Sequence, residues 1–217
     1  MIYCMKYTKL IMQLAFRPVN SWYQMKALLQ HIRPGAVYRR SDLEFYSSAI
    51  DRHLALLTQD GTLVKLSQGL YYAPTTSRFG PVPPDERVLI ERFLNSTDFL
   101  LVKPNAYNTL GLGLTQIYNT TWVYNHKRKG EFQLNGNTFE FVIKSSFPDR
   151  LTKEFLLVDL LNNLDVLADD QQLLLKKLPG KLDGFATDEL LKMTKLFGSG
   201  RTKKVVKSLL RNLYKHV

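Results

Sequence analysis

The chain has 217 residues, of which 45% are hydrophobic and 12% aromatic, so it can build packed cores and is not a disordered chain. Its 30 Lys and Arg against 19 Asp and Glu give a net charge of +11, which favours a polyanionic partner, nucleic acid before membrane. No apolar run reaches the roughly 18 residues of a membrane span, and the single cysteine, Cys4, excludes an internal disulfide. We therefore expect a cytoplasmic, nucleoid-associated protein without a membrane partner.

Residues 1–75 follow the pattern of three short helices and a hairpin, with 1–19 as a possible extra segment. Apolar residues spaced by three and four predict a helix over 21–31. A capping box predicts a short helix over 41–46, and one apolar face predicts a third helix over 47–59. Two short apolar runs around the turn at 67–69 predict a hairpin. This order is typical of a winged helix-turn-helix.

In a helix-turn-helix, the second helix of the pair enters the major groove of DNA with its N-terminal turns. Here that helix is 47–59, and Arg52 on its polar side suits the O6 and N7 acceptors of guanine. Two serines at its start suit phosphate oxygens, an arginine pair precedes the short helix, and polar residues occupy the wing tip. The predicted DNA-contacting residues are Arg39, Arg40, Ser47, Ser48, Arg52, Lys65, Ser67 and Gln68. Two alternatives remain: the arginine pair is only solvated, or Asp51 pairs with Arg52 or Arg40.

The proline-rich stretch that ends at Pro84 predicts a linker over 76–84. The second domain is then 85–217, beginning with a helix near 84–96. The sequence EFQLNGNTFEF predicts two alternating strands joined by a type I′ turn at Asn135-Gly136. With the apolar run around Trp122 it predicts a small antiparallel sheet over about 120–145, and the leucine-rich remainder predicts helices over 150–217.

Two further basic segments lie in this second domain, one in HKRKG between predicted strands and one along the last helix. They form a possible secondary basic surface or the solvated face of packed elements. Its residues are Lys127, Arg128, Lys203, Lys204, Lys207 and Arg211.

The sequence carries no pattern that points to an enzyme. Four histidines are scattered without ligand spacing, so no metal site is predicted. Gly111 and Gly113 lack the third glycine of a dinucleotide fingerprint, and Gly111 is instead expected to end a helix. Hydrolase signatures such as G-x-S-x-G are absent. We expect neither a catalytic residue nor a cofactor.

The segment LALLTQDGTLVKLSQGLYYAP, in which Gly-Leu-Tyr closes the wing, resembles the AbiEi-like antitoxins of bacterial type IV toxin–antitoxin systems. The likeness continues through DERVLIERF, KPNAYNTLGLGLTQ and KSSFP, and covers roughly residues 20–150. Residues 1–19 fall outside the resemblance. After residue 150 the likeness is limited to the helical character of the segment.

The resemblance implies an α+β protein with an N-terminal winged helix-turn-helix, followed by a mixed domain with a small antiparallel sheet and C-terminal helices. It also implies an antitoxin that represses its own operon by binding inverted repeats in double-stranded operator DNA. The implied partner is a nucleotidyltransferase-like toxin, counteracted without an obligatory stable complex. The alternative is a protein-interaction module that uses the winged helix as a docking platform without sequence-specific DNA binding.

Overall fold

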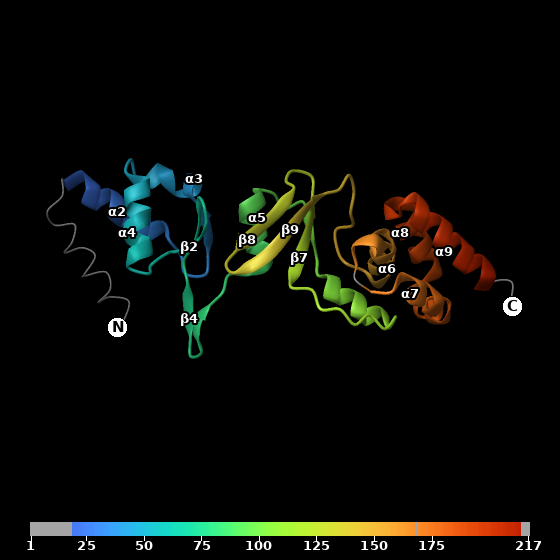
Figure 1. Ribbon diagram of the computed structural model, residues 1–217. Helices are drawn as coiled ribbons and strands as arrows, with labels where there is room; N and C mark the ends of the chain where they lie inside the picture. Colours follow the sequence, from blue (N-terminus) through green and yellow to red (C-terminus); the bar gives the residue numbers. More distant parts are fainter. Residues whose placement is uncertain (1–18, 168, 214–217) are drawn as a thin grey trace. The chain divides into compact units, whose positions relative to one another are not determined.

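The computed structural model describes residues 19–167 and 169–213, and Figure 1 shows their helices and strands. The fold is mixed α+β, with small sheets and a helical C-terminal part. The chain divides into two compact units. One takes the chain up to Thr97 together with Gln133–Gly136, and the other takes Asp98–Phe132 and the chain from Asn137 onward.

The first unit begins with helices and short strands in alternation. They are α2 (Val19–His31), β1 (Val37–Arg39), α3 (Arg40–Leu43), the 3-10 helix η1 (Glu44–Tyr46), α4 (Ile50–Gln59), β2 (Val64–Ser67) and β3 (Leu70–Tyr72). The predicted hairpin is confirmed as β2 and β3. The predicted short helix is split into α3 and η1. The sequence did not predict β1, which pairs with β3 and completes an antiparallel sheet of order β1-β3-β2.

The core of this unit forms between the sheet and the apolar faces of the helices. Ile50, Leu54 and Leu57 of α4 are buried against Met25 and Leu28 of α2, which confirms the predicted apolar faces. Burying side chains of this size stabilises a fold by about 1.5–3 kcal/mol each. The opposite side of α4 is therefore the side left to solvent.

The predicted linker over 76–84 contains a two-stranded sheet, β4 (Thr75–Ser77) and β5 (Gly80–Val82). Its turn is held by the Ser77 hydroxyl, which donates to the carbonyl of Gly80, and by the left-handed φ of that glycine, 112°. Helix α5 (Glu86–Leu94) follows and packs against β1, so the first unit extends to Thr97 rather than ending before residue 85.

The second unit is built around a four-stranded sheet of order β6-β7-β9-β8. Its strands are β6 (Phe99–Val102), β7 (Thr120–Asn125), β8 (Gly130–Leu134) and β9 (Asn137–Ile143). The prediction of an antiparallel sheet is wrong for its centre, because β7 and β9 are parallel, from Thr120↔Thr138 to Asn125↔Ile143. The type I′ turn is confirmed by positive φ at both Asn135 (50°) and Gly136 (78°).

The remaining elements are helical, as predicted. They are η2 (Pro104–Leu110), α6 (Lys153–Asn162), η3 (Leu164–Val166), α7 (Gln171–Lys177), η4 (Pro179–Gly184), α8 (Thr187–Phe197) and α9 (Gly200–Leu213). Helix α6 is the centre of the packing, with every residue from Phe155 to Leu161 buried, and it contacts η2, α8 and α9. Gly111 ends η2 with a left-handed φ of 66°, which confirms its predicted role. None of the helices in the described ranges is long and apolar enough to cross a membrane.

Candidate nucleic-acid interface

The exposed side of α4 carries the residues predicted to face DNA. Asp51, Arg52 and Ala55 are exposed, whereas the opposite side of the same helix is buried. The helix begins at Ile50 and not at Ser47. Ser47 lies in the preceding turn, where its hydroxyl accepts a hydrogen bond of 3.1 Å from the backbone N–H of Ala49.

Ser47 does not reach outward as the sequence predicted. Its side chain is buried, and its hydroxyl lies 2.8 Å from Nδ1 of His53, which is itself fully buried. The other ring nitrogen of His53, Nε2, lies 3.1 Å from the hydroxyl of Ser21 on α2. Ser47 is therefore part of the contact between α2 and α4, and its hydroxyl is not presented to a phosphate.

The contact between α2 and α4 extends to the exposed side of α4. Arg52 donates from Nη2 to the Ser21 hydroxyl over 3.3 Å. Ser48 is exposed and hydrogen-bonds to Gln24 of α2, at 3.0 Å from its amide nitrogen and 3.2 Å from its amide oxygen. Side chains of α2 thus hold the predicted recognition residues from one side, while Arg52 and Ser48 stay accessible.

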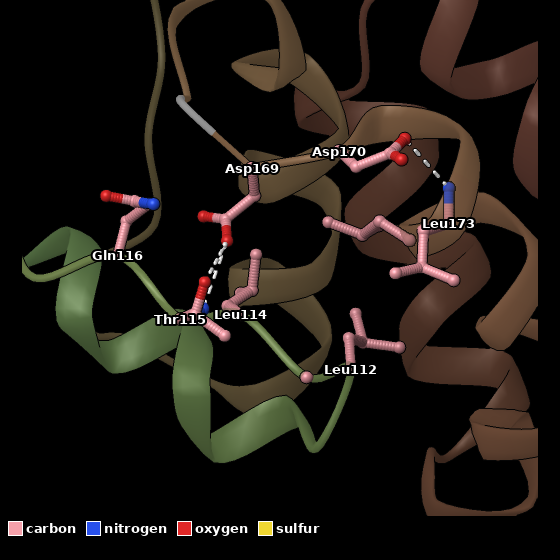
Figure 2. A pocket seen from close by; sticks show the side chains of 9 residues that line it. Leu112, Leu114, Thr115, Gln116, Asp169, Asp170 and Leu173 are labelled. Carbon is pink, nitrogen blue, oxygen red and sulfur yellow. Dashed lines mark hydrogen bonds between the residues drawn. The ribbon is translucent and has the colours of Figure 1, made fainter.

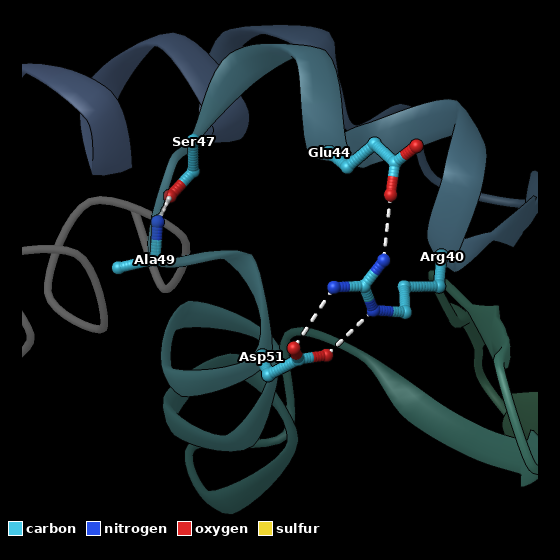
Figure 3. Close-up of polar contacts among 5 residues, drawn as sticks. All are labelled: Arg40, Glu44, Ser47, Ala49 and Asp51. Atoms are coloured by element: carbon cyan, nitrogen blue, oxygen red, sulfur yellow. Dashed lines mark hydrogen bonds and ion pairs between the residues drawn. The ribbon is translucent and has the colours of Figure 1, made fainter.

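Arg40 forms an ion-pair cluster with Asp51 and Glu44 (Figure 3). Its Nε and Nη2 donate to the two carboxylate oxygens of Asp51 over 2.7 and 2.9 Å, and its Nη1 donates to Glu44 over 2.6 Å. This confirms the alternative in which Asp51 pairs with Arg40. The hydrogen bond from Arg40 holds the pKa of Asp51 below its ordinary value, and the same bond raises the pKa of Arg40. Arg40 pairs with two carboxylates beside α4, so its guanidinium is already engaged and the cluster keeps one net negative charge.

Arg39 and the predicted wing residues, which the structure places on the β2–β3 hairpin, lie beside this cluster. Arg39 is half-buried and precedes α3, and its backbone N–H donates to the Asp42 carboxylate over 2.9 Å. Lys65 and Gln68 are exposed, and Lys65 pairs with Tyr71 across β2 and β3. The backbone N–H of Arg40 donates to the carbonyl of Gly69 over 2.8 Å, so the turn between β2 and β3 lies beside the cluster. Burial raises the pKa of Tyr71, and the nearby Asp51 raises it further. The hydroxyl of Ser67 is shielded from solvent and has no hydrogen-bond partner among the described residues.

The secondary basic residues all lie on the surface of the second unit. Lys127 and Arg128 are exposed in the loop between β7 and β8, where the buried Asn125 side chain accepts from both of their backbone N–H groups, at 2.8 and 2.7 Å. The four cations of α9 that the sequence assigned to this basic surface are also exposed. These are Lys203, Lys204, Lys207 and Arg211.

Sequence reasoning missed a buried carboxylate on α6. Asp159 is 2% exposed and accepts hydrogen bonds from the hydroxyls of Tyr107 on η2, at 2.7 Å, and Tyr124 on β7, at 3.0 Å. Burial raises the pKa of this carboxyl group and also the pKa of both tyrosines. The available signal was one charged residue inside the apolar run FLLVDLL. The cluster ties three elements of the core together and does not open to the surface.

Within residues 19–167 and 169–213, no three His, Cys, Asp or Glu side chains converge as metal ligands would. The predicted DNA-contacting residues that are exposed beside α4 and on the β2–β3 hairpin make up the candidate surface. We call it the α4–wing surface, and it consists of Ser48, Arg52, Lys65 and Gln68.

No protein-family model matches the sequence, and a search of curated proteins finds no match either. Among solved structures, the crystal structure of the RV2827C protein from Mycobacterium tuberculosis is similar to this chain, with a TM-score of 0.56 and 15% sequence identity. The likeness covers 89% of this chain and 77% of that one. At this identity the two proteins share a fold, and the likeness carries no statement about function.

Proposed function

We propose that the first unit is a winged helix-turn-helix that binds double-stranded operator DNA, and that the chain is the antitoxin and autorepressor of a type IV toxin–antitoxin operon. The DNA-binding part is supported by the order of α2, β1, α3, α4 and the β2–β3 hairpin, and by the sheet order β1-β3-β2. The antitoxin part, which counteracts a nucleotidyltransferase-like toxin, is supported by the sequence resemblance alone.

One observation carries the DNA-binding proposal: α4 buries one face and leaves Arg52 exposed on the other, at the N-terminal part of the helix. A guanidinium there can donate two hydrogen bonds to guanine O6 and N7, a contact worth about 1–3 kcal/mol of base discrimination. Lys65 and Gln68 on the wing would meet phosphate oxygens. Arg40 offsets one of the two negative charges of Asp51 and Glu44, so these carboxylates oppose the approach of a phosphate backbone less strongly than they would without it.

The test compares binding to DNA from upstream of the protein's own gene with binding to shuffled DNA of equal length. The Arg52→Ala variant should lose about 1–3 kcal/mol of preference for the upstream sequence. The Lys65→Ala variant should weaken binding to both DNAs equally and lower the salt slope by about 1. If Arg52→Ala lowers both affinities by the same factor, α4 does not read bases. The antitoxin part is tested separately, by growth rescue on co-expression with the nucleotidyltransferase-like toxin.

A second candidate is a docking platform for a protein partner. It is favoured by Phe45 on η1, whose side chain is 90% exposed. Phe45 precedes Ser48 of the α4–wing surface by three residues in the sequence. Exposed aromatic rings of this size are typical anchors of protein interfaces. This function is supported if pull-down experiments retain a stable partner with the wild type but not with Phe45→Ala, and if the protein prefers no DNA sequence.

A further inference from the structure

The second unit contains a cavity of about 210 Å³ between the segment that follows η2 and the start of α7 (Figure 2). Leu112 and Leu114 form one wall, and Leu173 and Leu174 form another. The polar part of the lining comes from Thr115, Gln116 and the adjacent carboxylates Asp169 and Asp170. A pocket with apolar walls and a few converging polar groups is typical of a small-molecule or side-chain site.

The carboxylates of Asp169 and Asp170 accept hydrogen bonds from different parts of the structure. Asp170 caps α7, because its Oδ1 accepts from the backbone N–H groups of Gln172 and Leu173 at 2.9 and 3.1 Å, and its side chain is exposed. Asp169 is fixed through Oδ1, which accepts from the backbone N–H of Thr115 at 3.0 Å and lies 3.4 Å from its hydroxyl. Its Oδ2 is shielded from solvent, yet no described residue hydrogen-bonds to it.

A carboxylate oxygen without a donor is costly to shield from water, because the charge has no compensating partner. Among the described residues, no cation lies in an ion pair with Asp169 or Asp170. Lys177 is the nearby candidate: its Nζ would lie 2.5 Å from a Cβ added to Gly113, a residue of the cavity lining. The Lys177 ammonium therefore lies beside Gly113, at the rim of the cavity, and forms no ion pair with Asp169 or Asp170.

We propose that this cavity binds an organic cation, a primary ammonium or guanidinium on a short aliphatic stem, with the charged group on Asp169 Oδ2 and the stem against the leucines. Such a ligand supplies the missing donors and covers apolar surface at the same time. The same chemistry occurs in free alkylamines and in the lysine and arginine side chains of a partner protein. The proposal does not depend on DNA binding by the first unit.

The experiment titrates the full-length, ¹⁵N-labelled protein with n-butylammonium, n-butylguanidinium and the neutral n-butanol, and follows the backbone amide of Thr115. Both cations should shift the resonance of this amide until the shift saturates, and butanol should leave the resonance unchanged. Asp169→Asn, which keeps an acceptor for Thr115, should weaken cation binding by at least about tenfold. Asp170→Asn removes the same charge and keeps a good helix cap, so it should change the affinity less than about twofold.

Lys177→Gln should change the affinity in the direction opposite to Asp169→Asn. Removing the ammonium from the rim should tighten binding of n-butylammonium, since like charges repel at short range. The proposal is overturned if butanol binds as well as the cations, if no ligand gives a saturable shift, or if Asp170→Asn weakens binding as much as Asp169→Asn. It is also overturned if Lys177→Gln abolishes the shift.

A final comparison identifies the source of the cation. Nα-acetyl-lysine N-methylamide carries the same stem and ammonium as butylamine, but adds the backbone groups of a protein. If it binds at least as tightly as butylamine, a partner's side chain is the occupant. If its backbone groups exclude it while butylamine binds, the occupant is a free amine.

Discussion

Asp159 shows at the scale of one residue how the core of the second unit responds to pH. Its folded-state pKa is raised by burial, so the folded protein keeps a proton that the unfolded chain releases above about pH 4. Between the unfolded and the folded pKa, the contribution of Asp159 to stability therefore decreases as the pH rises. Each unit of separation between the two pKa values is worth about 1.4 kcal/mol.

The corresponding prediction concerns the difference in unfolding free energy between the wild type and Asp159→Asn. This difference should fall as the pH rises from about 4 to 8, because only the wild type must hold a buried carboxylate. Urea unfolding in a Trp22→Phe background measures it, with Trp122 reporting on the second unit. Asp183→Asn, at an exposed position of η4, makes the same charge change and should leave the pH profile unaltered. A difference that grows with pH would contradict the sign of the shift.

At the scale of elements, α2 and α4 are held together by polar contacts as well as by their apolar faces. The hydroxyl of Ser47 lies against His53 and also accepts the N–H that begins the turn into α4. Removing this hydroxyl leaves buried polar groups without a partner, which costs about 1–3 kcal/mol. The orientation of α4 thus depends on residues that face away from the α4–wing surface.

We therefore predict that Ser47→Ala lowers the unfolding free energy of the first unit by about 1–3 kcal/mol. The matched control is Ser48→Ala, at the exposed neighbouring position, which should change stability by less than about 0.5 kcal/mol. Urea unfolding reported by Trp22 in a Trp122→Phe background separates the two effects. Equal destabilisation by both variants would show that the buried contact does not anchor α4.

The elements that the sequence predicts well are those with a local signal. Apolar spacing predicted the buried faces of α2 and α4, and the Asn135-Gly136 dipeptide predicted its turn. The start of α4 was placed too early, because the contact that holds Ser47 in the core, with His53, leaves no local signal in the sequence. Strand β1 is only three residues long, too short for a periodic pattern.

Contacts between distant segments are what the sequence could not predict. The parallel neighbours β7 and β9 are separated by β8 in the chain, so reading consecutive strands as neighbours assigned the wrong direction. Thr115 and Asp169 are 54 residues apart, and their contact defines the proposed cation pocket. The pairing of Arg40 with Asp51 was foreseen only as one of several options, because charge alone does not select a partner.

At the scale of the whole molecule, the net charge of +11 is unevenly distributed, and the last acidic residue is Glu189. Along α9, Lys203, Lys207 and Arg211 follow one another at intervals of four, and such like-charged pairs destabilise a helix by a few tenths of a kcal/mol each. A row of exposed cations that repel one another is suited to a polyanion. In the framework of the proposed DNA binding, we expect it to contact phosphates outside the bases read by α4.

Changing Lys203, Lys204, Lys207 and Arg211 of α9 to glutamine should therefore reduce the salt slope of DNA binding by about 1 to 4, because each phosphate that is no longer neutralised lowers the slope by about 0.9. Fluorescence anisotropy at several salt concentrations measures the slope. A control variant must remove the same charge elsewhere on the second unit. Its four substituted residues are Lys176, Lys181, Lys192 and Lys195, all exposed. If both variants lower the slope equally, α9 acts only through net charge. If the α9 variant keeps the wild-type slope, its cations lie away from the DNA and serve another partner.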